Sequence, residues 1–353
     1  MKLFTCANCS KPLYFENYYC ENCGLQVGFN PGSMEFMPAV GEENGLIIPW
    51  HADIKDQLRY CSNRVYNACN WLVPAGENSS FCKACELNRI IPSLDNADYL
   101  RRWQTLEIAK HRLIYSLIQL NLPIVSKIKD PVAGLLFDFM ADDTQKVMTG
   151  HDEGVITINI AEADDIEREM ARRNLDEVYR TVLGHFRHEV GHYYWDRLIR
   201  DTGLLNEFRL VFGNEQQDYE TALNTHYSQG APLNWNQSYI SAYATMHPWE
   251  DWAETWAHYL HIVDTLETAH AFGLKIRPAS ELATDLGVSI AENPYHIKDF
   301  EKIINRWLPL TVALNSLNRS MGLPDAYPFV IPQPVIQKLQ FIHQLLHKQS
   351  IVA

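Results

Sequence analysis

The chain contains no hydrophobic run long enough to cross a membrane and no excess of positive charge. Its 353 residues nowhere approach the run of about 18 apolar residues that a membrane-spanning helix needs. The opening residues, Met-Lys-Leu-Phe-Thr-Cys, lack the apolar core of a secretory signal. The 30 lysine and arginine residues are outnumbered by 43 acidic residues, and the net charge of −13 disfavours binding to nucleic acid or to anionic membranes. We therefore expect a cytoplasmic protein.

Cysteine is absent beyond residue 85, and repeats and low-complexity segments are absent throughout. All eight cysteines lie between residues 6 and 85, and such a cluster in a reducing compartment favours metal binding over disulfides. The hydrophobic share of 46% and the charged share of 21% are typical of globular proteins and exclude a largely disordered chain. The length fits about two domains, with room for a small third one.

The first four cysteines form two CxxC pairs, Cys6 with Cys9 and Cys20 with Cys23. Each CxxC turn presents two thiolates on one side, and two such turns make the tetrahedral sulfur cage that Zn²⁺ prefers. The pattern predicts a structural zinc ribbon. The alternative, a redox-active pair, is disfavoured because a redox site needs one pair beside a βαβ unit rather than two matched pairs.

The other four cysteines, Cys61, Cys69, Cys82 and Cys85, are spaced less regularly, and only the last two form a CxxC. They predict a second Cys₄ zinc site, with buried free thiols as the alternative. Exchange of ligands between the two sets of cysteines, or a contribution from His51, stays open. Both zinc ions would be structural, because they stabilise segments too short to build an apolar core, and the ribbon would suit a protein partner.

We expect an α+β fold in three parts. Residues 1–46 would form the zinc ribbon and a linker rich in glycine and proline over 28–46, residues 47–95 the second cysteine module, and residues 96–353 a mostly helical domain with a small sheet. Alternating apolar residues predict a strand over 154–160, at a sheet edge that either pairs with a substrate or is covered. Apolar periodicity predicts helices over 97–121, 175–200, 249–269, 298–318 and 333–347.

The predicted helix over 175–200 carries His188, Glu189 and His192 in an HExxH motif. Residues i and i+4 share a helix face, so both imidazoles would point the same way and supply two of the three protein ligands of a catalytic zinc. The extended form of this motif, HExxHxxGxxH, is excluded, because Trp195 and Leu198 stand where it needs glycine and histidine.

A third ligand is expected near the start of the predicted helix over 249–269, where Glu250 and Glu254 again share one face. We expect Glu250 to bind zinc and Glu254 to accept the N–H of a ligating histidine, with the reverse assignment as the alternative. An acidic first turn placed to complement the helix dipole would explain Glu250 but not Glu254. With zinc in place, Glu189 would act as the general base toward a zinc-activated water.

An HExxH motif followed by a glutamate on a separate helix resembles the gluzincin arrangement of thermolysin-like peptidases. The stretch Glu250–Glu254 is also similar to the Glu-x-x-Ala-Glu helix of anthrax lethal factor, in which the first glutamate binds zinc and a tyrosine seven residues earlier assists catalysis. That resemblance assigns this catalytic role to Tyr243, with Tyr239 as the alternative.

The chain as a whole resembles a bacterial family of zinc-binding metallopeptidases with an N-terminal zinc ribbon. The resemblance implies a metallopeptidase-like domain over 96–353, one catalytic and two structural zinc ions, and a peptide or protein substrate. The segments that carry it are Cys6–Cys23, Cys61–Trp71, Phe81–Cys85, His188–Asp196 and Ser241–His261.

Two other functions stay open. One is a non-catalytic zinc-binding interaction protein, and the other is a metal-dependent hydrolase of non-peptide amides. The first is disfavoured by Glu189, because a purely structural zinc site does not need that carboxylate. His226 and His247 are weaker candidates for stabilising an oxyanion, and His185 is expected to be structural or to lie behind the ligands.

Overall fold

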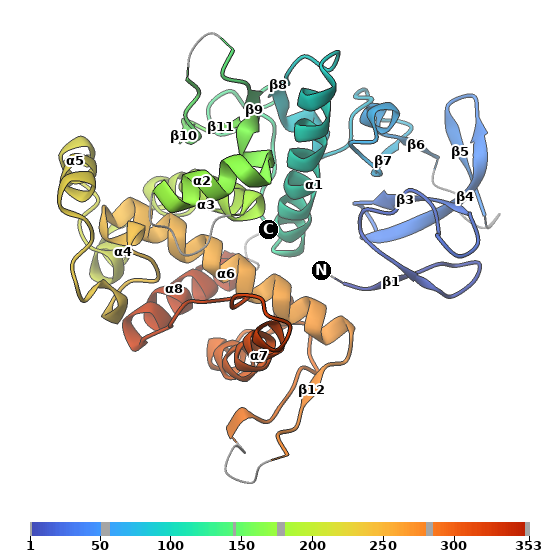
Figure 1. Cartoon of the computed structure of the whole chain (residues 1–353). Coiled ribbons are helices and arrows are strands. Elements are labelled where there is room, and N and C mark those ends of the chain that lie inside the picture. The colour runs from blue at the N-terminus through green and yellow to red at the C-terminus, as the bar shows by residue number, and fades with distance from the viewer. Residues whose placement is uncertain (1, 51–56, 144–145, 175–180, 280–284, 350–353) are drawn as a thin grey trace. The chain divides into compact units, whose positions relative to one another are not determined.

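A computed structural model describes residues 2–50, 57–143, 146–174, 181–279 and 285–349. His51 lies outside these residues. The chain forms two compact units, Met1–Arg168 and Glu169–Ala353. The fold is α+β, with small sheets and both cysteine clusters in the first unit and a mostly helical second unit (Figure 1). The three-part division stays a prediction.

The N-terminal part of the first unit is a set of short antiparallel strands. Strands β1 (Phe4–Thr5) and β2 (Pro12–Leu13) pair with each other, and β3 (Gln26–Asn30), β4 (Glu35–Glu43) and β5 (Leu46–Pro49) form a three-stranded sheet. The expectation of a linker over 28–46 is therefore wrong. Its glycines and prolines lie in or between strands that bury Val27, Phe29, Met37, Ala39 and Ile47, and burial of apolar surface outweighs the weak strand propensity of Gly and Pro.

Strands β6 (Leu58–Tyr60) and β7 (Leu72–Pro74) pair with each other and join the same core, with Cys61 directly after β6 and Cys69 shortly before β7. An aromatic cluster holds them to the ribbon, in which the rings of Phe29 and Trp71 lie 4.9 Å apart between centroids. The side chain of Asn70 donates hydrogen bonds to two ribbon carbonyls, those of Phe15 at 2.7 Å and Asn17 at 2.9 Å. A second apolar cluster joins β4 to β7 and contains Met37, Ala39, Ile47, Leu58, Tyr60 and Leu72.

Helix α1 (Ala97–Gln119) confirms the helix expected over 97–121. Asn96 caps it by accepting hydrogen bonds from the backbone N–H groups of residues 98 and 99. A four-stranded sheet in the same unit has the order β10-β11-β9-β8. Strand β11 (Val155–Asn159) confirms the expected strand, but β10 and β9 pair with its two sides, so the expected edge position is wrong. The outer strands are β10 (Gly150–Asp152) and β8 (Asn88–Ile90), and the central partner is β9 (Leu136–Met140).

The second unit is built around α6 (Pro248–Ala271), the long helix in the centre of this unit in Figure 1. Helices α3 (Val182–Leu198) and α8 (Gln333–Gln349) pack on it, and α7 (Phe300–Ser320) contacts both α6 and α8. A buried ion pair between Arg187 on α3 and Asp264 on α6 also links these two helices. The remaining helices and strands of this unit are α4 (Leu205–Phe212), α5 (Tyr219–Gln229), β12 (Lys275–Ile276) and β13 (Val288–Ser289), and α2 (Asp165–Asn174) begins in the first unit and ends in the second.

The helices expected over 249–269, 298–318 and 333–347 are confirmed as α6, α7 and α8. The helix expected over 175–200 is confirmed from residue 182 onward, and residues 175–180 lie outside the described part. Helices α4 and α5 were not predicted. Among the described residues, no helix combines the length and the apolar character that crossing a bilayer requires.

Candidate metal centres

Helix α3 places His188 and His192 one turn apart on the face that it turns toward α6. The helix starts where the Thr181 hydroxyl accepts a hydrogen bond from the backbone N–H of Gly184 at 3.0 Å. Helix α6 starts similarly, since the Nδ1 atom of His247 accepts from the backbone N–H of Trp249 at 3.1 Å and Pro248 occupies the first turn. Both caps fix where the functional side chains fall along their helices.

Three electron-rich atoms converge between these helices. The Nε2 atoms of His188 and His192 lie 3.2 Å apart. The Oε2 atom of Glu250 lies 3.0 Å from the first and 3.4 Å from the second. Ligands held at about 2.0–2.1 Å by one tetrahedral zinc are separated by roughly 3.3–3.4 Å, so the three atoms have the spacing of a zinc site.

Glu254 fixes the orientation of the His188 ring. Its Oε1 atom lies 2.6 Å from Nδ1 of His188, and its Oε2 atom accepts a hydrogen bond from the Ser241 hydroxyl at 2.6 Å. A carboxylate can only accept, so Nδ1 of His188 carries a proton and donates it to Glu254, which leaves Nε2 facing Glu250. Burial would raise the pKa of Glu254, but the hydrogen bond with His188 lowers it to about 2.

The charges around this point also favour a cation. Burial disfavours the charged form of His188, yet Glu250 and Glu254 raise its pKa well above the usual value. Burial opposes ionisation of Glu250 as well, but the two histidines hold the pKa of this carboxyl well below its usual range. The two carboxylates at this buried place are thus stabilised by positive charge. A metal ion would supply that charge without added protons on the two imidazoles.

Tyr219 on α5 completes the surroundings of Glu250. Its hydroxyl donates a hydrogen bond of 2.8 Å to Oε1 of Glu250, which leaves Oε2 toward the histidines. Burial and the nearby Glu250 carboxylate both raise the pKa of Tyr219, so it remains a donor at neutral pH. The ring of Trp249 covers His192, with 3.7 Å between centroids.

Glu189 and Tyr243, the expected catalytic residues, both lie at this site. Glu189 follows a ligand candidate directly on α3, is 9% exposed, and is near enough to Tyr219 to contribute to its raised pKa. The ring of Tyr243 lies 6.0 Å from that of His188. Burial, followed by Glu250, raises the pKa of Tyr243, so its hydroxyl stays protonated. The alternative, Tyr239, instead lies beneath the ammonium group of Lys338, 4.1 Å from its ring centroid.

The other histidines singled out in the sequence have different places. His226 lies beside Tyr243, with 5.8 Å between ring centroids. His247 caps α6 and contacts the carbonyl of Gln217 through Nε2 at 3.1 Å, which gives it a structural role. His185 lies on α3 one turn before His188 and is not among the groups that could share a metal ion.

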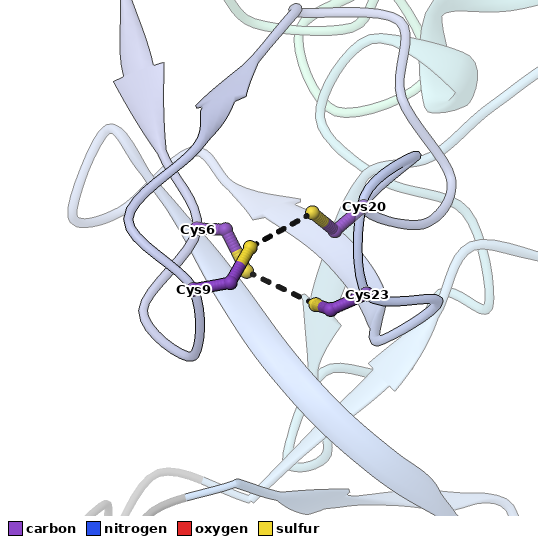
Figure 2. A group of neighbouring side chains, drawn as sticks. All are labelled: Cys6, Cys9, Cys20 and Cys23. Carbon is purple, nitrogen blue, oxygen red and sulfur yellow. Dashed lines mark hydrogen bonds between the residues drawn. The ribbon is translucent and has the colours of Figure 1, made fainter.

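The first cysteine cluster gathers Cys6, Cys9, Cys20 and Cys23 (Figure 2). The sulfur atoms of Cys6 and Cys23 lie 3.7 Å apart, and those of Cys9 and Cys20 lie 3.5 Å apart. Sulfur ligands of one tetrahedral zinc are separated by roughly 3.7–3.8 Å, given zinc–sulfur bonds of about 2.3 Å. The four thiols therefore fit one zinc ion and form no disulfides in this arrangement.

The second cluster gathers the other four cysteines, all buried, and ligands do not mix between the two sets. Cys69 and Cys82 have their sulfur atoms 3.6 Å apart. The cluster also contains a residue that the sequence did not suggest. The Nε2 atom of His111, on α1, lies 3.2 Å from the sulfur of Cys69.

Residues 99–345, which include α3 and α6, match the protein family described as "Putative zinc-binding metallo-peptidase". The chain belongs to this family. Residues 3–96, which include all eight cysteines, match a zinc-ribbon domain. The sequence resemblance implied a member of a zinc-binding metallopeptidase family with an N-terminal zinc ribbon. This expectation is confirmed.

Relatives of this metallopeptidase family member occur in mycobacteria. It is 44% identical over 347 residues to an uncharacterized protein of Mycobacterium bovis, across 98% of this chain and 95% of the relative. Uncharacterized proteins from two strains of Mycobacterium tuberculosis match it to the same extent. No solved structure matches the chain.

Sequence reasoning did not find Tyr219, Ser241 or His111. Tyr219 lies on α5, whose described residues include no buried ones, so no apolar stripe signals that helix. Ser241 contacts Glu254, which lies 13 residues later, and His111 contacts cysteines that lie 26–42 residues earlier in the chain. Spacing patterns report residues that share an element, and none of these three shares an element with the candidate-site residue that it contacts.

Proposed function

We propose that the chain is a zinc-dependent peptidase in which His188, His192 and Glu250 bind the catalytic zinc. The observation that supports this assignment most directly is the convergence of two Nε2 atoms and Oε2 of Glu250 at 3.0–3.4 Å. The contact between Glu254 and Nδ1 of His188 favours Glu254 as the residue that orients the ligand rather than the ligand itself. The arrangement is that of a gluzincin.

In this proposal each neighbouring side chain has a defined task. His188, His192 and Glu250 would hold a zinc ion, which would lower the pKa of a bound water to about 7 and polarise a substrate carbonyl. Glu189 accepts the proton of the attacking water and delivers it to the leaving amine. Tyr243, kept protonated by burial, donates a hydrogen bond to the oxyanion that forms on the substrate carbonyl.

The substrate class is a peptide or a protein, and the two cysteine clusters hold structural zinc ions. Eight reduced thiols fit a cytoplasmic location, because oxidising compartments would convert many of them to disulfides. The sequence also allowed a hydrolase of non-peptide amides. Digestion of an unbiased peptide library separates these substrates, because only a peptidase releases new peptide termini.

The variant Glu189→Gln tests the proposal. It should keep its zinc, because residue 189 is not a ligand, and should cleave library peptides roughly 10²–10⁴-fold more slowly than the unmodified chain. Zinc content and cleavage are measured on the same preparation by elemental analysis and mass spectrometry. The matched control is Glu207→Gln, an exposed position on α4, which should change neither. Full cleavage by the Glu189→Gln variant would remove Glu189 from the mechanism.

A further inference from the structure

The second cysteine cluster has more donors than one tetrahedral zinc can use. In addition to Cys61, Cys69, Cys82 and Cys85, the imidazole of His111 faces the cluster. Its Nε2 atom lies 3.2, 3.8 and 3.7 Å from the sulfur atoms of Cys69, Cys82 and Cys85, respectively. His111 is 4% exposed, so the protein has buried a fifth donor beside four thiols.

The hydrogen bonding of His111 is that of a metal ligand. Its Nδ1 atom lies 2.6 Å from the backbone carbonyl oxygen of Glu107, one turn earlier on α1. A carbonyl oxygen can only accept, so Nδ1 carries a proton, and a neutral ring would then present the lone pair of Nε2 to the sulfur atoms. Ligating histidines commonly donate their second nitrogen in this way, because the bond fixes both the tautomer and the ring orientation.

The three distances separate the cysteines into two kinds. A nitrogen and a sulfur bound to one tetrahedral zinc lie roughly 3.5–3.6 Å apart, given bonds of about 2.0–2.1 and 2.3 Å. Cys82 and Cys85, at 3.8 and 3.7 Å, can share a zinc ion with His111 with little adjustment. Cys69, at 3.2 Å, lies closer than two ligands of one zinc would. Cys69 and His111 therefore compete for the same coordination position.

The charge around the cluster favours the imidazole at that position. Glu107 and Lys110 form a fully buried ion pair, with 2.7 Å between Oε1 and Nζ, and the other carboxylate oxygen of Glu107 lies 3.6 Å from the sulfur of Cys85. Four thiolates around Zn²⁺ carry two net negative charges. Replacing one thiolate with a neutral imidazole removes one of them from a site without solvent, where buried charge is costly.

We propose that this cluster is a five-donor zinc site, in which His111 replaces Cys69 and holds zinc together with Cys61, Cys82 and Cys85. The first cluster offers the natural comparison. Residues 1–50 contain no histidine, and among the described residues the metal-binding group around Cys6 consists of four cysteines. Loss of the Cys9 thiol should therefore empty the first cluster, whereas loss of the Cys69 thiol should not empty the second.

Zinc per chain, measured by elemental analysis of the full-length protein, tests this difference. Cys9→Ala should lose one zinc ion relative to the unmodified chain. Cys69→Ala and His111→Ala should each keep the full number, because either residue can supply the fourth ligand, and the Cys69→Ala/His111→Ala double variant should lose one. Loss of a zinc ion from Cys69→Ala alone would overturn the proposal. Retention of the full number of zinc ions by Cys9→Ala would also overturn the proposal, because both clusters would then keep zinc after losing one cysteine.

A measurement on the unmodified chain guards against a variant that fails to fold. Long-range ¹⁵N–¹H correlation spectra of histidine-labelled protein report which ring nitrogen of His111 carries the proton, and the His111→Ala spectrum assigns the signal. Protonated Nδ1 with unprotonated Nε2 is the expected result. A proton on Nε2 would overturn the proposal, because His111 would then donate an N–H to the thiolates and could not bind zinc.

Discussion

At the residue scale, the site depends on two glutamates with different tasks. Glu250 and Glu254 lie one turn apart on α6, yet the first faces both Nε2 atoms and the second faces Nδ1 of His188. A second oxygen on each carboxylate is also occupied, by Tyr219 and Ser241, respectively. Both oxygen atoms of each carboxylate therefore have a partner. The side chains are already ordered, so less rotamer freedom is lost when a metal binds.

The first prediction concerns Tyr219, which we expect to position Glu250, the proposed metal ligand. Tyr219→Phe removes the hydrogen bond to Oε1 and should weaken zinc binding roughly 10–100-fold, as loss of contacts behind a metal ligand typically does. Competition with a chelator measures the zinc affinity directly. Tyr227→Phe, at an exposed position on the same helix, is the control and should bind zinc normally. Equal affinities of the two variants would contradict the positioning role.

At the element scale, the close approach of α3 and α6 brings the ligands together. A Cβ atom added at Gly191 would lie 3.1 Å from the Cα of Ala253 and 3.2–3.3 Å from the side chain of Trp256. The indole N–H of Trp252 also donates to the carbonyl of Gly191 at 2.8 Å. Glycine at this position of the HExxH motif therefore allows the two helices to pack closely enough for residue 250 to reach the histidines.

Gly191→Ala should push the helices apart. We expect a net loss of about 1–3 kcal/mol in the free energy of unfolding, because overpacking at backbone distance outweighs the better helix propensity of alanine. Urea unfolding and zinc affinity should both report the change. Gly76→Ala, where the added methyl group meets nothing within 4 Å, is the control. A Gly191→Ala protein of unchanged stability and zinc affinity would show that the contact is not limiting.

The contact between α6 and α8 predicts a pH dependence. His343 is fully buried, with its Nδ1 2.9 Å from the Tyr259 hydroxyl and its Nε2 3.1 Å from the carbonyl of Lys298. Burial, and then the neighbouring His347, lower the pKa of His343 to about 4. The unfolded chain binds a proton here below about pH 6.5 while the folded chain does not, so stability should fall between about pH 6.5 and 4.

The variant His343→Gln isolates this effect, because glutamine cannot be protonated in that range. Urea midpoints measured at pH 7.5, 6 and 5 should fall less steeply for His343→Gln than for the unmodified chain. His296→Gln, at an exposed position, should leave the slope unchanged. Identical slopes for all three proteins would mean that His343 is not the group responsible.

Helices with one apolar face were predictable from the sequence, as α1, α6, α7 and α8 show. The periodic pattern survives because each of these helices packs against a neighbour within its own unit. The hairpin of β3 and β4 was mistaken for a linker, since its glycines and prolines outweighed a short apolar run in the sequence pattern. Helix α5 showed no apolar periodicity in the sequence, because its residues are all exposed or only partly buried.

At the scale of the whole molecule, the candidate ligand groups could be read from the sequence more easily than the residues that surround them. Ligand spacing on one helix or in one turn is a local property, so HExxH, the paired glutamates and the CxxC turns could be read directly from the chain. Tyr219, Ser241 and His111 reach their partners through tertiary contacts that no spacing encodes. The choice between Glu250 and Glu254 likewise depends on which carboxylate meets which ring nitrogen.

The most direct test of the account is the zinc content of the unmodified chain and of His192→Ala, measured per chain by elemental analysis. We predict three zinc ions, one in each cysteine cluster and one between α3 and α6, which fall to two in the variant while its circular dichroism spectrum is retained. Two zinc ions in both proteins would contradict the central claim, because His188, His192 and Glu250 would then hold no zinc.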